Sequence, residues 1–274
     1  MILSNFYAEF DSEEKAVKYF KSVYESVLKS CKNCRSKSLR WNNGLVGWKC
    51  SKCSKFHSLK SLTFMKDSNL KFLTWLEVVF LLTETKKTLS ISEITRLISI
   101  DRYKTVFYMV QKIRKAMGEI NLSGFYQKRS SIDIRYSNLK LVPHLSLFYG
   151  KQDGEKMDFI RLEIPQIIHN KYRSQVLHLK GSISFRLKKI LLERFKMYEA
   201  YPKNLFQKIE MKRVKSSWER KIRSNFLREL KGIYHHVSLL YFQNVLDEYC
   251  FKYNYRNSVK DKFKIFVEAS SESR

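Results

Sequence analysis

The chain has 274 residues, of which 44% are hydrophobic, so disorder is excluded and one large domain or two to three small ones can form packed cores. Lys and Arg number 53 against 26 Asp and Glu, and the formal net charge of +27 indicates a polyanionic partner, nucleic acid first. The most apolar run, residues 72–83, is interrupted by Glu77, so we expect no membrane-spanning helix. The first residues, MILSNFYAEFDSEEK, have no basic region before an apolar core, so we expect no secretory signal.

The first part of the chain predicts helices around a cysteine-rich segment. Apolar residues at helical spacing predict a helix over residues 11–29, which Asp11 or Ser12 can cap. Residues 31–57 have no such period and carry glycines and tryptophans, as expected for short strands and turns. A helix is predicted again over residues 70–83.

Two further helices, over residues 90–98 and 102–117, are separated by a short turn. Ser90 and Glu93 have the spacing of a capping box at the start of the first. The pair fits either a helix-turn-helix or an ordinary helical hairpin with solvated basic residues. In a helix-turn-helix, the start of the second helix reaches base edges. The candidates for base contact are then Arg102, Tyr103, Lys104 and Thr105.

The second half of the chain begins with β-branched and aromatic runs. Strands are predicted at residues 132–136, 141–149 and 159–164, the last two joined by the turn KQDGEK, and a brief strand is predicted at 175–179. Most of the remainder is predicted as helix, with the terminal ASSESR frayed. Residues 171–231 carry 18 Lys or Arg against 5 Asp or Glu, which indicates phosphate contact or a solvated basic face.

Four of the five cysteines form two CxxC pairs that are separated by 15 residues. An intracellular protein keeps its thiols reduced, so metal ligation is the first interpretation and incidental burial the alternative. Two such pairs can hold one Zn²⁺ tetrahedrally, and a closed four-thiolate site is structural because it has no open position for a substrate. The predicted zinc ligands are Cys31, Cys34, Cys50 and Cys53. Cys250 lies among aromatic residues and is predicted to be a buried structural thiol.

These pieces occur in an order typical of one family. The helix and the cysteine ribbon are followed by FHSLKSLTFMKDSNLKFLTWLEVVFLL and ISISEITRLISIDRYKTVFYMVQKIRKAM, and later by RELKGIYHHVSLLYFQNVLDEYCFKYNYRN. The chain thereby resembles the ISXO-type DDE insertion-sequence transposases, most specifically at residues 232–238 and 247–256. The resemblance implies a multidomain α/β fold. It comprises an N-terminal helix with a zinc ribbon (1–60), a helix-turn-helix domain (68–120) and a ribonuclease-H-like domain (125–270).

In that family, two divalent ions held by Asp, Asp and Glu cut and join DNA. Carried onto this chain, the first acid is Asp133, whereas the second position falls on Lys180 and the third on Arg220, with Glu219 as the alternative third acid. Cations at these positions repel Mg²⁺ and can bind phosphate directly. We therefore expect Asp133 to be the remnant of a lost triad, or part of an active one in a different register.

The first functional hypothesis is a domesticated transposase, catalytically inactive, that binds double-stranded DNA as a regulator or accessory factor. It would contain structural zinc, be cytoplasmic and nucleoid-associated without contacting a membrane, and could form a homo-oligomer. The second hypothesis is an active DDE transposase that uses Mg²⁺. The third is a zinc-dependent scaffold that binds RNA or an acidic protein.

Overall fold

The computed structural model describes residues 3–98, 100–127, 133–135, 147–153, 156–163, 176–178, 217–234 and 236–272. The chain divides into two compact units, and each is described by itself. The first unit comprises Met1–Ser123 and Tyr255–Arg274, and the second comprises Gly124–Asn254. The end of the chain therefore folds with its beginning, although the resemblance placed residues up to 270 in the third domain.

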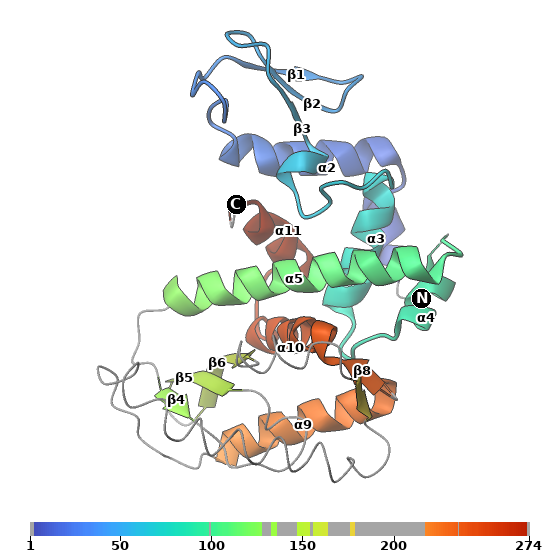
Figure 1. The fold of residues 1–274 in the computed structure, drawn as a ribbon, viewed down its shortest axis with the longest axis vertical. Coiled ribbons are helices and arrows are strands. Elements are labelled where there is room, and N and C mark those ends of the chain that lie inside the picture. Colours follow the sequence, from blue (N-terminus) through green and yellow to red (C-terminus); the bar gives the residue numbers. More distant parts are fainter. Residues whose placement is uncertain are drawn as a thin grey trace. The chain divides into compact units, whose positions relative to one another are not determined.

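The first unit is mostly helical (Figure 1). Its helices are α1 (Ser4–Glu9), α2 (Glu13–Val27), the short 3₁₀ helix η1 (Lys60–Leu62), α3 (Phe72–Glu84), α4 (Ile91–Leu97), most of α5 (Tyr103–Gln127) and α11 (Lys262–Glu272). The Ser12 cap of α2 is confirmed, since the Ser12 side chain accepts a hydrogen bond from the Lys15 amide. None of the described helices combines the length and the hydropathy that a membrane span requires.

Helix α11 packs against α2 and α3. The Phe263 ring lies 5.8 Å from the Phe10 and Phe80 rings and stacks on Tyr19, while the Phe263 amide donates to Glu84 Oε1 at 2.8 Å. The prediction of a frayed ASSESR was wrong for residues 269–272, because α11 extends through Glu272 and buries Ser270 and Ser271, while residues 273–274 lie outside the described residues. Burial of the apolar face holds this helix, whatever the polarity of its final residues.

A three-stranded antiparallel ribbon confirms the strands expected in residues 31–57. Its strands, in the order β1-β2-β3, are β1 (Leu39–Asn42), β2 (Gly47–Cys50) and β3 (Phe56–Ser58). A Cβ on Gly47 would lie 2.4 Å from the His57 carbonyl oxygen, so the pairing of β2 with β3 requires glycine. The Trp41 and Trp48 rings meet edge to face at 4.7 Å, and the Lys21 ammonium of α2 lies over Trp41 at 5.0 Å.

The described part of the second unit contains short antiparallel sheets and two helices. The strands are β4 (Asp133–Arg135), β5 (Leu147–Asp153) and β6 (Lys156–Glu163), in the order β4-β5-β6, and β7 (Val176–His178), which pairs with β8 (His236–Ser238). The helices are α9 (Ser217–Ile233) and α10 (Leu239–Asn254). The hairpin is confirmed, but KQDGEK is not all turn, because β5 continues through Asp153 with a bulge at Lys151/Gln152 and β6 begins at Lys156.

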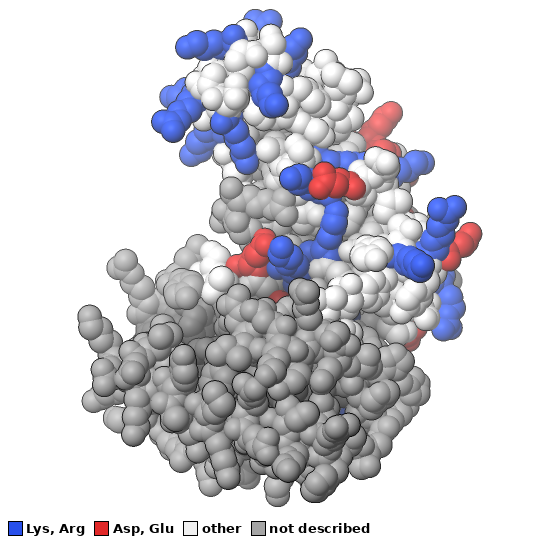
Figure 2. Space-filling model, in the orientation of Figure 1, with Lys and Arg blue, Asp and Glu red and all other residues white. Residues whose placement is uncertain are grey.

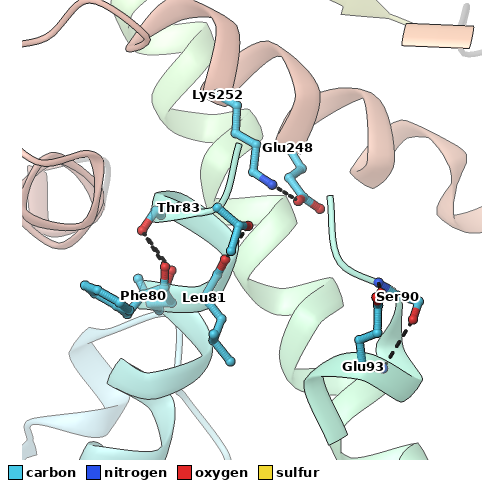
Figure 3. A network of polar contacts seen from close by, with 9 residues as sticks. Phe80, Leu81, Thr83, Ser90, Glu93, Glu248 and Lys252 are labelled. Atoms are coloured by element: carbon cyan, nitrogen blue, oxygen red, sulfur yellow. Dashed lines mark hydrogen bonds and ion pairs between the residues drawn. The ribbon is translucent and has the colours of Figure 1, made fainter. Parts of the chain in front are cut away.

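Helix α10 packs on β6. The Asn254 side chain exchanges two hydrogen bonds with the Ile160 backbone, at 2.7 and 2.9 Å, and the Leu162 amide donates to Cys250 Sγ at 3.3 Å. Cys250 is 1% exposed, which confirms the predicted buried thiol. On the same helix, Lys252 Nζ lies 2.8 Å from Glu248 Oε1 (Figure 3), so the buried carboxylate has an opposite charge beside it. The described chain is thus a mixed α/β protein, mostly helical, with small antiparallel sheets.

Candidate metal centre and nucleic-acid interface

The four predicted zinc ligands lie together. Their sulfur atoms are all within 4.8 Å of one another, with Cys31 Sγ 3.6 Å from Cys53 Sγ and Cys34 Sγ 3.5 Å from Cys50 Sγ. A tetrahedral zinc with Zn–S bonds of about 2.3 Å separates its sulfurs by about 3.8 Å, so this cluster can hold such an ion. Cys31 and Cys50 are buried, and Cys34 and Cys53 are half-buried.

The two CxxC segments have the same backbone geometry. The Arg35 amide donates to the Cys31 carbonyl at 2.8 Å, and the Ser54 amide donates to the Cys50 carbonyl at 3.0 Å. Arg35 and Ser54, each one residue after the second cysteine of its pair, have φ of 58° and 56°. This left-handed conformation turns the chain tightly and favours glycine, so both segments accept some backbone strain to direct their cysteines to one point.

The thiols differ in acidity. Hydrogen bonds from the Lys55 backbone amide, then from the Asn33 side chain, lower the pKa of Cys53 to about 6. The Ser36 backbone amide lowers the pKa of Cys34, but burial and its contacts with the other three thiols outweigh this bond and raise that pKa to about 12. The metal-free cluster therefore retains a proton at Cys34 at neutral pH, and a cation must displace it to bind four thiolates.

The sequence reasoning missed His57, which supports this cluster from β3. His57 Nε2 lies 3.2 Å from Cys31 Sγ, and the side chain is 7% exposed. Burial, then the charges of Lys32 and Lys55, lower the pKa of His57. When a metal holds Cys31 as a thiolate, a neutral imidazole in this position can donate Nε2–H to it, a bond of the kind that orients metal ligands. The strand register decides its position, because His57 pairs with Trp48, on the buried face of β2, and a local sequence pattern does not reveal this pairing.

The predicted helix pair is present as α4 and α5. The Ser90 side chain accepts from the Glu93 amide at 3.2 Å, and Glu93 Oε2 accepts from the Ser90 amide at 2.8 Å (Figure 3), which confirms the capping box. The pKa of Glu93 is lowered mainly by the hydrogen bond from the Ser90 backbone N–H, because this bond stabilises the carboxylate. The beginning of α4 is therefore well determined by its own sequence.

The candidate base-contact residues lie at the beginning of α5. Arg102, Tyr103 and Lys104 are exposed, and Thr105 is half-buried. Tyr103 is 51% exposed and stacks on Phe107 at 6.5 Å, an unusual position for a ring that could pack in a core. The opposite face of the same helix is apolar and buried, and its residues include Val106, Met109 and Val110. Arg102 and the first turn of α5 thus present two cations and one aromatic ring to solvent.

The candidate catalytic residues lie on separate elements of the second unit. Asp133 is the first residue of β4, where it pairs with Gly150 of β5. Glu219 and Arg220 both lie in the first turn of α9. Lys180 lies outside the described residues.

Among the described residues, the potential metal ligands that converge on one point are these four cysteines. Comparisons of the chain with known protein families, with curated proteins and with solved structures find no match. The residues of this chain therefore supply the basis for assigning a function: the cysteine cluster, the exposed start of α5 and the cationic composition.

Proposed function

We propose that the protein is a zinc-containing, transposase-derived protein that binds double-stranded DNA without catalysing strand transfer. The observation that carries this proposal is the start of α5, where Arg102, just before the helix, and Tyr103 and Lys104 in its first turn are exposed while the other face of the helix is buried. A chain of net charge +27 supplies the attraction for phosphate, and the exposed helix start supplies contacts that distinguish bases.

Zinc has a structural role in this function. The four thiolates close its coordination sphere, so the metal holds the ribbon and takes no part in chemistry on DNA. By binding all four cysteines as thiolates, the ion displaces their protons and couples its binding to the folding of the ribbon.

The loss of catalysis rests on the resemblance to the ISXO-type DDE transposases and their ribonuclease-H-like domain. Two of the three acid positions fall on Lys180 and Arg220. A lone carboxylate at Asp133 cannot bridge two divalent ions, and cations beside it would repel them. Lys180 and Arg220 would instead contact phosphate, and the protein would act at the nucleoid as a regulator or accessory factor, as a monomer or a homo-oligomer.

The alternative is an active DDE transposase that uses Mg²⁺. One observation favours it: Asp133 begins a strand, where the first acid of that family lies, and Glu219 is adjacent to Arg220 in α9. A shift of one residue in register would restore a second carboxylate.

The test of DNA binding uses the full chain loaded with zinc. Binding to duplex DNA should weaken steeply between roughly 50 and 200 mM salt, because released counterions drive it. Arg102→Ala and Lys104→Ala should reduce discrimination between sequences, whereas Arg220→Glu should weaken all sequences about equally. Binding that ignores salt would exclude a phosphate-dominated interface.

The test of catalysis is an end-cleavage and joining assay with Mg²⁺ and with Mn²⁺ on the preferred DNA. We expect no product from the wild-type chain. Metal-dependent cleavage that disappears in Asp133→Ala or Glu219→Ala would replace the first proposal with the active transposase.

A further inference from the structure

The ribbon lies in a stretch of the chain that contains no acidic residue. Residues 26–66 carry ten Lys or Arg and no Asp or Glu, which leaves a net charge of about +8 once four thiolates and Zn²⁺ are included. Nine of these ten cations are exposed, the exception being the half-buried Lys60. Figure 2 shows Lys and Arg side chains gathered around the ribbon at the top of the view.

The strand register separates the ribbon into two faces. Trp41 pairs with Trp48, and Trp48 pairs with His57; these residues form the inner face, which holds the histidine beside the cysteines. Because side chains alternate along a strand, the neighbouring pair Arg40 and Lys49 lies on the opposite, outer face. Both side chains are exposed.

Arg40 and Lys49 occupy directly opposite positions on paired strands, where like charges destabilise a sheet. Neither forms an ion pair with any acid in the described part of the chain. A stabilising role within the fold therefore does not account for this pair, whereas an external anion would offset its repulsion.

Arg35 is a third cation at a position that the fold does not favour. Its φ of 58° would suit glycine, yet the position carries an exposed guanidinium. Part of its charge can offset the dianionic zinc centre next to it. The outer-face pair lies on the side of the sheet away from Trp48 and Cys50, so it is the pair that remains available to a ligand.

We propose that the outer face of the ribbon, defined by Arg40 and Lys49, binds the phosphate backbone of duplex DNA independently of base sequence. This inference rests on the proposed function and adds a second contact, separate from the base contacts of α5. Phe56, which pairs with Lys49, also lies on the outer face but is half-buried, and the other positions of this face, Asn42 and Ser58, are polar. Polynucleotide therefore fits this mainly cationic and polar surface better than an acidic protein or an anionic membrane, which would need an exposed apolar anchor. A polar, cationic surface on a metal-stiffened ribbon suits a uniform line of phosphates.

The test measures the affinity of the full zinc-loaded chain for a labelled duplex of arbitrary sequence, from about 50 to 200 mM salt. The variant Arg40→Gln/Lys49→Gln should lose about tenfold in affinity per lost contact at the lowest salt, and the slope of log K against log salt should become shallower by about 2. The matched control, Lys18→Gln/Lys86→Gln, removes two exposed cations outside the ribbon and should change affinity little. Zinc content and melting temperature should be unchanged or raised, since a repulsion is relieved.

The outcomes separate the two proposals. If wild type binds DNA but Arg40→Gln/Lys49→Gln behaves like its control, the outer-face contact is overturned and DNA binding by the protein stands. If wild type fails to bind duplex DNA, the proposed function fails and this contact fails with it. If polyglutamate or anionic lipid vesicles displace the duplex at equal charge concentration, the assignment of the face to DNA is overturned. A loss that is equal for all DNA sequences supports it.

Discussion

The ribbon and the helical core of the first unit are stabilised in different ways. In the core, α2, α3 and α11 pack around aromatic rings, among them Phe6, Phe20, Phe64 and Phe263, all nearly or fully buried. The ribbon has short strands, few buried apolar side chains and a net excess of cations, and its buried centre is the cysteine cluster. A small apolar area cannot offset the conformational entropy of ordering such a segment, so we expect the ribbon to need a bound metal for its stability and the core to need none.

The largest effect is expected from removing the metal ligand Cys34. Cys34→Ser should abolish tight zinc binding and unfold residues 31–57, because structural zinc in small domains contributes on the order of 10 kcal/mol to folding. Elemental analysis should find one zinc per wild-type chain and none in the variant. Hydrogen exchange should show lost protection in the ribbon while α3 and α11 keep theirs. Equal thermal stability with and without metal would contradict the comparison.

The next effect concerns the aromatic core. Phe263→Ala should lower the free energy of unfolding by about 3–5 kcal/mol, since it removes a ring that is 3% exposed and leaves a cavity among four other rings. Denaturant unfolding of the zinc-loaded chain measures it. The control is Val259→Ala, which truncates a fully exposed side chain and should change stability by less than about 0.5 kcal/mol. Loss of zinc affinity in Phe263→Ala would show that core and ribbon do not fold separately.

Removing the Glu13 carboxylate, by which α2 caps the start of α3, should lower the stability of the chain by a smaller amount. Glu13 of α2 accepts from the Phe72 and Leu73 amides of α3, both at 2.8 Å. Glu13→Ala should destabilise the chain by about 1–2 kcal/mol, because two amides at the start of α3 lose their partner. Glu14→Ala, at an exposed neighbour, is the control in the same denaturation experiment. Equal stability of the two variants would contradict the cap.

The ribbon, unlike the core, should depend on pH through its thiols. The pKa of Cys34 is raised to about 12, and that of Cys53 is lowered to about 6. Between these values zinc displaces at least the Cys34 proton, so zinc affinity should rise by at least about tenfold per pH unit, and below about 6 the dependence should steepen as Cys53 also protonates. Competition with a chromophoric chelator at several pH values measures the slope. A flat profile between pH 6 and 8 would contradict a protonated Cys34.

The smallest effect tests the strain in the ribbon. Arg35 and Ser54 have positive φ of 58° and 56°, a conformation that glycine adopts without strain. Arg35→Gly and Ser54→Gly should each raise the free energy of unfolding of the zinc-loaded ribbon by up to about 1 kcal/mol. The greater conformational entropy of glycine in the unfolded chain reduces this gain. Melting of the zinc-loaded chain measures both. Ser54→Gly changes no charge, so it separates the relief of strain from the loss of the Arg35 cation. A lower melting temperature in both variants would show that the turns are not strained.

Local patterns predicted the elements whose causes lie within a few residues. The caps at Ser12 and Ser90 marked the starts of α2 and α4, and the spacing of four cysteines predicted a cluster that the structure confirms as a candidate metal site. The turn KQDGEK was predicted too long, because strand pairing between β5 and β6 overrode the turn-forming residues. The helix-turn-helix assignment and the role of Asp133 stay predictions.

What the sequence by itself determined is therefore local: helix starts, the cysteine pairs, the buried thiol and the excess of cations. Only the tertiary structure decided that Glu13 caps α3, that His57 bonds to Cys31, and that α11 joins the first unit through Glu84. These contacts join residues 59, 26 and 179 positions apart. A short pattern cannot specify such partners, because each contact exists only after burial of apolar faces has brought distant elements together.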